Sequence, residues 1–507
     1  MKITLSRFLL IVVFSLANAF CVFRLANEDS ASSLKTMVGY SDLGHFGFKE
    51  AWYGIYFQED KVGYSHFLIE PSGKDFIIHS DSLMRLTAMK KTTEIKMSEK
   101  VLVRPDLALI SFESSVTMNE KVLQITGKND DGKLSVFMTA SGERIDRTYQ
   151  IEGNLYHSSA ISLMPALKGL NQDATYSFTV FNPEKQSMET VDQLISRVAG
   201  SPGPNDAVWK VQNKFGSTIV NSWLDRKGLT VLEKALEGSL ITVVEDESLA
   251  REFLNRKAQQ KDLILDLSLV KSPMIIKMPE SIHQLKAVIH GVDPSLFPED
   301  HRQKIRNLES QTSPNSAEVV VSVEKISSYR QNKTNSILMK PDQKRAERFE
   351  KELASTFNIQ SDHEKIIHRA NSIVFQKDPD IDKVLKLVNW TSDNVRKSMR
   401  DSFSALEVLQ TMEGECQSHA SLYTAMARSL KIPTRIVTGL VYSDGLGFLY
   451  HAWAESYVDG WLSVDPTLKQ APADATHIKI GNTINGEESY SLLKMVGKLK
   501  IESIDYH

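Results

Sequence analysis

Apolar and polar residues alternate along the first part of the chain at the two-residue period of β-strands. Residues 51–70, AWYGIYFQEDKVGYSHFLIE, place two such runs on either side of a charged turn. Residues 71–86 repeat the pattern after a Pro-Ser-Gly turn, and similar runs recur up to about residue 140. This pattern predicts an antiparallel, meandering β-sheet that is open or partly closed.

Two changes of pattern divide the rest of the chain. Residues 201–204, Ser-Pro-Gly-Pro, mark a local break, and strand-like pieces then alternate with polar loops. From Pro341 onward, apolar residues recur at helical spacing and form one stripe: Ile381, Val384, Leu385, Val388 and Val395. We expect a β-rich domain at 25–204, a mixed β-rich intermediate region at 205–340 and an α+β domain at 341–507.

The N-terminus has the order of a secretory signal peptide. Lys2 and Arg7 precede an apolar run, and Ala17-Asn18-Ala19 offers small residues for cleavage. Residues 1–24 are therefore expected to be a signal peptide. The alternative is an uncleaved anchor, although the apolar run 8–23 is slightly shorter than the ~20 residues of a spanning helix. Both alternatives predict an exported protein, periplasmic or held at the inner membrane by this segment.

The chain contains only two cysteines. Cys21 lies beside the export signal, and Phe20 disfavours its lipidation because lipoprotein processing requires a small residue at that position. Cys416 therefore lacks an ordered disulfide partner in a compartment expected to be oxidising. Such a thiol is either buried and inert or used in chemistry.

Composition excludes one class of function. The chain has 507 residues, of which 41% are hydrophobic and 24% charged, a formal net charge of −3 and a pI near 6.5. This is the composition of a globular protein with a real core. Because no basic field is available to hold phosphates, no nucleic-acid partner is expected.

Cys416 is predicted to begin a helix. Ser404 and Glu407 fit the capping box of a preceding short helix, and Gly414 is placed to end it. The first turn of a helix presents unpaired N–H groups and a partial positive charge, which favour a thiolate. The N–H of Cys416 can also face an oxyanion. The inward positions of the helix are expected to be Ala420, Tyr423, Ala427 and Leu430.

Residues 449–467, LYHAWAESYVDGWLSVDPT, offer a proton carrier for this thiol. A two-residue hairpin loop would point His451 and Asp465 to opposite faces. A three-residue loop at 458–460, with its glycine left-handed, places Trp453 opposite Asp465 and makes His451 a diagonal neighbour of Asp465 on one face. We therefore expect the three-residue loop.

Cys416, His451 and Asp465 then supply the nucleophile, base and orienting group of acyl transfer. His451 would keep Cys416 ionised and later protonate the leaving amine, while Asp465 would fix the tautomer of the ring. One alternative is an inert buried Cys416. Another is a zinc site, although the chain lacks the closely spaced ligand pairs that usually preorganise one.

Three ordered blocks resemble the core of the transglutaminase-like superfamily, in the form found in exported bacterial proteins: GECQSHASLYTAMARSLKIPTRIVTGL, HAWAESYVDGWLSVDPT and PADATHIKI. The resemblance covers roughly residues 355–485. It implies a papain-like α+β core in which Cys416, His451 and Asp465 are the catalytic triad. Lys469 departs from the pattern, because related exported members often carry glycine there, and no residue matches a second oxyanion donor. The β-rich region resembles N-terminal regions attached to such proteins.

These observations predict a cysteine-dependent enzyme that acts on amide bonds of envelope proteins or peptides through a thioester. Hydrolysis by water is slightly preferred over cross-linking to an amine, and no cofactor or metal is expected. The alternative is a non-catalytic transglutaminase-like scaffold or binding protein. Six neighbouring residues are interpreted as structural: His419, Arg435, Trp453, Glu455, Trp461 and His477.

Overall fold

The computed structural model describes residues 50–57, 59–88, 91–118, 121–130, 132–140, 142–183, 187–198, 204–215, 218–235, 238–255, 269–308, 315–323, 326–327, 348–398, 402–483 and 498–507. The expected signal peptide or anchor, residues 1–24, lies outside them. The described residues fall into two compact units, 50–255 and 269–507. Within these ranges, no helix has the length and apolar character needed to cross a bilayer.

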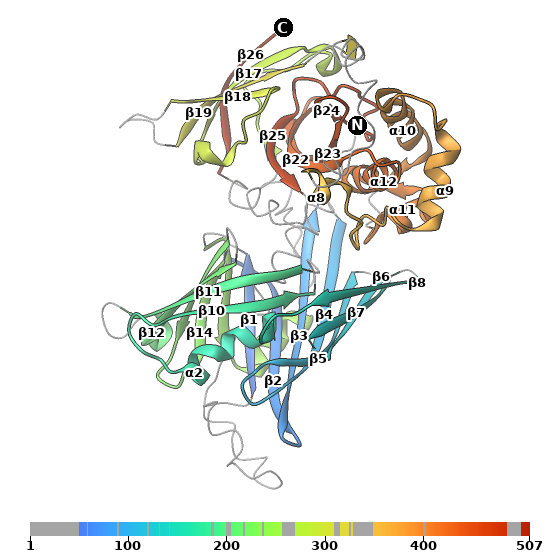
Figure 1. Ribbon diagram of the computed structural model, residues 1–507. Coiled ribbons are helices and arrows are strands. Elements are labelled where there is room, and N and C mark those ends of the chain that lie inside the picture. Colours follow the sequence, from blue (N-terminus) through green and yellow to red (C-terminus); the bar gives the residue numbers. More distant parts are fainter. Residues whose placement is uncertain are drawn as a thin grey trace. The chain divides into compact units, whose positions relative to one another are not determined.

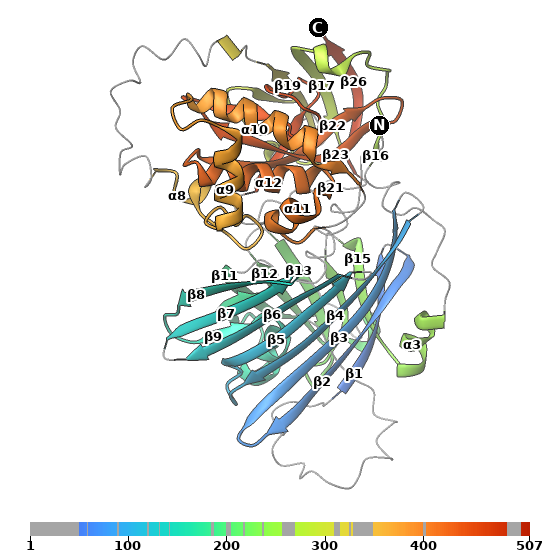
Figure 2. The ribbon, with the colours of Figure 1, turned by 90° about the vertical axis from the view of Figure 1, so that its right-hand side faces the viewer.

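The first unit is built on one 15-stranded sheet, ordered β8-β7-β6-β5-β4-β3-β2-β1-β15-β14-β13-β12-β11-β10-β9 (Figures 1 and 2). All its strand pairs are antiparallel except β9 with β10, so the expected antiparallel, β-rich character is confirmed. The first eight strands form a meander: β1 (Glu50–Phe57), β2 (Asp60–Ser72), β3 (Asp75–Ala88), β4 (Lys91–Val103), β5 (Leu109–Met118), β6 (Lys121–Asp130), β7 (Lys133–Ala140) and β8 (Glu143–Gln150).

The same sheet continues beyond residue 204. Its remaining strands are β9 (Leu155–His157), β10 (Thr175–Asn182), β11 (Ser187–Arg197), β12 (Trp209–Phe215), β13 (Thr218–Leu224), β14 (Thr230–Ala235) and β15 (Leu240–Glu245). The helices among them are η2 (Ser158–Leu163), α2 (Met164–Lys168), η3 (Pro204–Asp206) and α3 (Glu247–Asn255). Because β11 pairs with β12, the boundary expected at 204 falls inside this sheet. Proline and glycine indicate a local break but not whether the next strand returns to the same sheet.

The second unit contains two further sheets. One consists of β16 (Leu269–Val270), β23 (Gly447–Tyr457), β22 (Thr434–Ser443) and β25 (Ile478–Thr483), with β24 (Trp461–Val464) also paired to β23. The other consists of β18 (Gln303–Asn307), β19 (Ser316–Ser322), β17 (Gln284–His290) and β26 (Lys500–Tyr506). Strands from 269–322 thus pair with C-terminal strands, so the boundary expected at 340 also lies inside a unit.

Five helices lie on one side of β22–β25, with the second sheet on the other side (Figure 1). They are α8 (Glu350–Leu353), α9 (Glu364–Ile373), α10 (Asp380–Asn394), α11 (Ala405–Thr411) and α12 (Cys416–Ser429). The expected stripe is confirmed, since Ile381, Val384, Val388 and Val395 are buried and Leu385 is partly buried.

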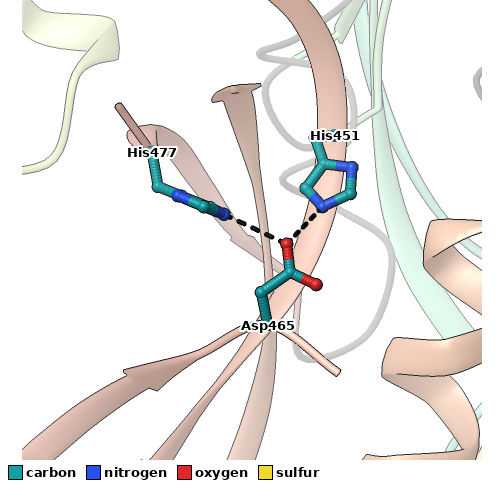
Figure 3. Close-up of side chains that lie close together, drawn as sticks. All are labelled: His451, Asp465 and His477. Atoms are coloured by element: carbon teal, nitrogen blue, oxygen red, sulfur yellow. Dashed lines mark hydrogen bonds and ion pairs between the residues drawn. The ribbon is translucent and has the colours of Figure 1, made fainter. Parts of the chain in front are cut away.

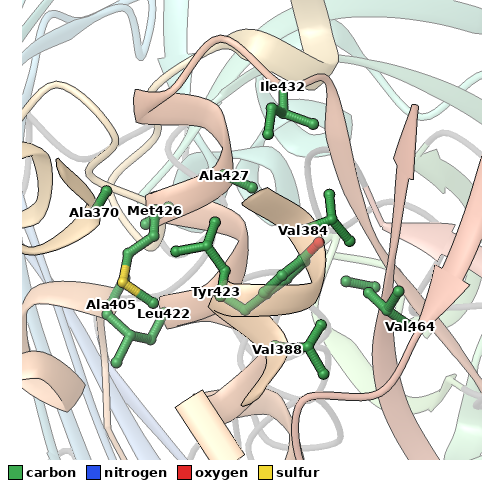
Figure 4. Close-up of a cluster of buried hydrophobic side chains, with 14 of the residues drawn as sticks. Ala370, Val384, Val388, Ala405, Leu422, Tyr423, Met426, Ala427, Ile432 and Val464 are labelled. Atoms are coloured by element: carbon green, nitrogen blue, oxygen red, sulfur yellow. The ribbon is translucent and has the colours of Figure 1, made fainter. Parts of the chain in front are cut away.

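Helix α12 forms the centre of this hydrophobic core (Figure 4). It packs against the other helices and against β22, β23 and β24. Three of its expected inward positions, Ala420, Tyr423 and Ala427, are completely buried, while Leu430 caps the helix and is partly buried. The start of α12 is therefore held firmly against the strands that carry the remaining site residues.

Candidate active site

Cys416 is the first residue of α12, as its sequence context predicts. Ser404 caps the preceding helix by accepting a hydrogen bond from the N–H of Glu407 at 3.2 Å. The Glu407 carboxylate reaches back to the N–H of Phe403 rather than to that of Ser404, so the second half of the capping box is displaced by one residue.

Met412, not Gly414, ends α11 with a left-handed φ of 51°. Gly414 has a different role, because a Cβ built on it would lie 2.3 Å from the Cβ of Ser418. The glycine therefore allows the short segment before Cys416 to approach the first turn of α12.

The β23–β24 hairpin has the expected three-residue loop. Tyr457 pairs with Trp461 and Ala454 with Val464, which is the predicted register. Asp459, with a φ of 65°, takes the left-handed conformation that was expected of the glycine after it. The ladder ends at Val464, and Asp465 instead forms an isolated bridge with Gln470, at the end of the strand.

His451 and Asp465 meet on one face as predicted. Nε2 of His451 lies 2.6 Å from Oδ2 of Asp465, and both side chains are completely buried. Oδ1 of Asp465 accepts the backbone N–H groups of Thr467 at 2.7 Å and Leu468 at 3.0 Å. Burial acts to raise the pKa of Asp465, but His451 and His477 outweigh it and hold that pKa well below its usual value.

The contact with Asp465 occupies Nε2 of His451, so Nδ1 is the ring nitrogen that remains for another partner. Burial lowers the pKa of His451, but Asp465 and Cys416 outweigh burial and raise that pKa to about 9. Because Cys416 is one of the groups that raise this pKa, its thiol lies near the ring. Nδ1 has no partner with ordinary hydrogen-bond geometry among the described residues.

His477 is the residue whose place the sequence did not predict. Its Nε2 lies 3.1 Å from Oδ2 of Asp465, the same oxygen that contacts His451 (Figure 3). Its Nδ1 lies 3.1 Å from Oδ1 of Asp474. The sequence signal was the motif DATH, which places an acidic residue three positions before the histidine.

The other residues interpreted as structural have structural contacts. The two ring nitrogens of His419 lie 2.8 Å from the carbonyl oxygen of Glu415 and 3.0 Å from that of Val395. The indole N–H of Trp453 donates to Ser463 at 2.9 Å. Further along the hairpin, Glu455 pairs with Arg435 and Lys479, and the Arg435 guanidinium lies over the ring of Trp461.

The backbone at Lys469, where the resemblance implies glycine, has a conformation that suits glycine. Its φ of 60° is left-handed, a conformation that glycine adopts without steric cost. The side chain of Lys469 forms an ion pair with Asp393 at 2.6 Å, with both groups about half exposed. The lysine at this position therefore combines a strained backbone with a surface contact.

His451, Asp465 and His477 also have the side chains of a metal site, since their ligand atoms lie within 4.8 Å of one another. However, each Nε2 atom faces Oδ2 of Asp465 at hydrogen-bond distance. A metal ion bound by these atoms would have to replace both hydrogen bonds. Hydrogen bonding accounts for this arrangement by itself.

Residues 367–466 match the model of the Transglutaminase-like superfamily. This confirms the resemblance carried by the sequence blocks and places a transglutaminase-like segment in the C-terminal part of the chain. The match contains Cys416, His451 and Asp465 but ends before Asp474 and His477. No curated protein matches the chain.

Solved structures with similarity are distant in sequence. A candidate cysteine protease from Cytophaga hutchinsonii is 18% identical with a TM-score of 0.28, covering 45% of this chain and 86% of that one. A β-barrel-like protein of a domain of unknown function from Brucella abortus is 12% identical with a TM-score of 0.31, covering 39% of this chain and 94% of that one. A candidate protease from Parabacteroides distasonis is 9% identical with a TM-score of 0.19, covering 77% of this chain and 70% of that one.

Proposed function

We propose that this protein is a cysteine-dependent acyl-transfer enzyme that acts on amide bonds of proteins or peptides. One observation carries the proposal: His451 contacts buried Asp465 through Nε2, while its Nδ1 has no hydrogen-bond partner among the described residues and Cys416 acts on the pKa of the ring. A base held by a carboxylate on one nitrogen and facing a nucleophile with the other is the arrangement that activates a thiol.

The pKa of His451, raised to about 9, makes its ring an imidazolium at neutral pH. In this proposal the ring takes the proton of Cys416, and the sulfur is the nucleophile. In the first step Sγ attacks the amide carbon. A C–S bond forms, and the C–N bond breaks as His451 gives its Nδ1 proton to the leaving amine. Water or an amine then attacks the thioester and transfers its proton to His451, and the thiolate is released.

The position of Cys416 supports stabilisation of the tetrahedral intermediate. The first N–H groups of an α-helix lack intrahelical partners, and Cys416 is the first residue of α12. Its N–H is the oxyanion donor in this proposal. We also propose that α12 and β22–β25 constitute a papain-like core, with nucleophile on the helix and base on the strand.

We further propose that the enzyme acts outside the cytoplasm on cell-envelope substrates, which the N-terminal sequence pattern supports. Hydrolysis is the preferred outcome, and transfer to an amine is the alternative. A non-catalytic scaffold has less support, because a binding protein has no need of a buried carboxylate that orients an imidazole beside a thiol.

Trapping of the acyl-enzyme tests the proposal. Purified protein is incubated with envelope peptides, quenched in acid and analysed by peptide mass spectrometry. A thioester adduct on Cys416 that is absent from Cys416→Ala is the expected result. Iodoacetamide at neutral pH gives a second readout, because a thiolate reacts faster than a free thiol. Alkylation no faster than that of a free cysteine, together with no adduct, would support the scaffold.

A further inference from the structure

The carboxylate of Asp465 makes more contacts than a triad requires. Oδ2 faces both His451 at 2.6 Å and His477 at 3.1 Å, and Oδ1 accepts two backbone N–H groups. Because a carboxylate offers about four lone-pair positions, all its accepting positions are filled. Its orientation is therefore fixed from four directions.

A second carboxylate holds His477. Oδ1 of Asp474, which faces Nδ1 of His477, also accepts the N–H and the hydroxyl of Thr476 at 2.8 and 2.6 Å. Oδ2 of Asp474 accepts the side-chain amide of Gln470 at 2.7 Å. Asp474 is thus as firmly oriented as Asp465.

Both ring nitrogens of His477 face carboxylate oxygens, so both must donate protons and the ring must be an imidazolium. Burial lowers the pKa of His477, but Asp474 and Asp465 outweigh burial and raise it to about 9. The ring is fully buried, and its centroid lies 5.9 Å from that of His451. A second positive charge therefore lies beside the proposed catalytic base.

Other side chains contact the two histidine rings or interact with them electrostatically. The ring of Trp453 lies against both, with centroids 6.3 Å from His451 and 5.1 Å from His477. Two residues of α12 also interact with this group. Cys416 acts on the pKa of His451, and the charge of Asp465 acts to raise the pKa of His419.

Two cationic side chains that contact or lie close in sequence to residues 473–477 have partners of their own. Arg302 donates to the carbonyl oxygens of Ala473 and Asp474. Lys479 is paired with Asp300 and Glu455. The charges that act directly on Asp465 are therefore those of the two histidines.

We propose that His477 is a positioning residue of this site: held by Asp474, it donates to the oxygen of Asp465 that contacts His451, and so fixes the carboxylate and limits the negative charge that His451 experiences. The proposal rests on the proposed function of Cys416 and extends the site beyond the residues that the family match covers. A purely structural histidine would stabilise the fold without altering the protonation of His451.

Loss of the positive charge of His477 should raise the pKa of His451. Removing the charge of His477 leaves Asp465 with one strong partner and leaves Asp474 uncompensated, and both changes favour protonated His451. His477→Gln should therefore raise the pKa of His451 by about one unit. Asp474→Asn should raise it less, because it removes a more distant negative charge as well as the charge of His477.

NMR titration of side-chain-labelled histidines in the full-length protein measures these values without any substrate. His157→Gln is the matched control, because His157 is also completely buried but lies in the other unit. The expected results are an imidazolium His477 at neutral pH in the wild-type protein, an upward shift of His451 in His477→Gln and no shift in the control.

Chemical reactivity gives an independent readout. Anionic iodoacetate is attracted to protonated His451, whereas neutral iodoacetamide is not, so the ratio of their rates on Cys416 follows the charge of the ring. The pH at which this ratio falls should move upward in His477→Gln and Asp474→Asn. Turnover should also decrease in both variants, through kcat rather than KM.

Three results would overturn the inference: a neutral His477 at pH 7 in the wild-type protein, an unchanged pKa of His451 in both variants, or a stoichiometric metal ion that is lost with His477. The first is measured without any variant, so the inference is testable even if His477→Gln does not fold. If Cys416 is unreactive but His477 is charged and shifts His451, the proposed function fails and the charge coupling stands.

Discussion

Nε2 of His451 lies 2.6 Å from Oδ2 of Asp465, a contact between completely buried side chains 14 residues apart in the sequence. The contact closes the open end of the β23–β24 hairpin. Because it occupies Nε2, the nitrogen available to Cys416 is Nδ1. The protonation of His451 therefore depends first on this carboxylate.

Asp465→Asn should lower acyl transfer by about two to four orders of magnitude, because an amide cannot stabilise the imidazolium and selects the wrong tautomer. Without the carboxylate, burial should dominate and return the pKa of His451 from about 9 toward or below 6.5. The pH dependence of the iodoacetate-to-iodoacetamide ratio measures this change. An unaltered profile would exclude the proposed role of Asp465.

The stability of the C-terminal unit should fall as pH rises from 6.5 to about 9. The pKa values of His451 and His477 are both raised to about 9 from an unfolded value near 6.5. Their stabilising contribution is therefore complete below pH 6.5 and lost as pH passes through 9, at about 3 kcal/mol for each histidine.

Calorimetry at pH 6.5 and pH 9 tests this prediction. The transition of the C-terminal unit can be assigned because His477→Gln should shift it and reduce its pH dependence. Equal stability of the wild-type unit at the two pH values would contradict the raised pKa values.

Gly414→Ala should impair Cys416 more than it impairs the fold. The added methyl group would lie 2.3 Å from the Cβ of Ser418, so the first turn of α12 must move. The rate of Cys416 alkylation should fall at least about tenfold. Gly445→Ala is the matched control, because Gly445 has a φ of 74° but no atom within 4 Å of an added Cβ. It should lower stability and leave alkylation unchanged.

Lys469→Gly should be neutral or slightly stabilising. Glycine relieves the left-handed backbone, at a gain of about 1 kcal/mol, while the exposed ion pair with Asp393 contributes about 0–1 kcal/mol. Lys469→Ala loses the ion pair and keeps the strain, so it should be about 1 kcal/mol less stable than the glycine variant. Thermal unfolding of the two variants measures the difference, and a more stable alanine variant would contradict the explanation.

Tyr423→Phe should cost about 1 kcal/mol of stability. The Tyr423 hydroxyl lies 2.7 Å from that of Ser456, which also contacts Thr434 at 2.9 Å, so the pair joins α12 to β23. The double variant with Ser456→Ala should lose less stability than the sum of the single variants, because they share one interaction. Additive losses in urea unfolding would show that the contact is not coupled.

The catalytic hypothesis could be reached from sequence because it depends on local rules. A helix start after Glu415, a two-residue strand period and a three-residue hairpin loop are each set by nearby residues, and together they place His451 and Asp465 on one face. Even so, local turn chemistry was misassigned twice: the left-handed residues are Met412 and Asp459 rather than Gly414 and Gly460. Packing holds these residues in a conformation that their own side chains disfavour.

These local rules do not predict which strands pair when they are far apart in the sequence. The sequence did not indicate that β12–β15 return to the first sheet, or that β17 pairs with β26 more than two hundred residues later. Strand periodicity specifies which side chains of a strand share a face. Which other strand pairs with its edge depends on packing across the whole fold.

The sequence by itself determined the thiol, the imidazole, the carboxylate and the face that the last two share, because spacing along one hairpin or one helix settles such relations. Only the tertiary structure placed His477 and Asp474 behind Asp465. That contact depends on where the chain after β24 returns, and burial in the folded core is what turns the four side chains into one network of charges.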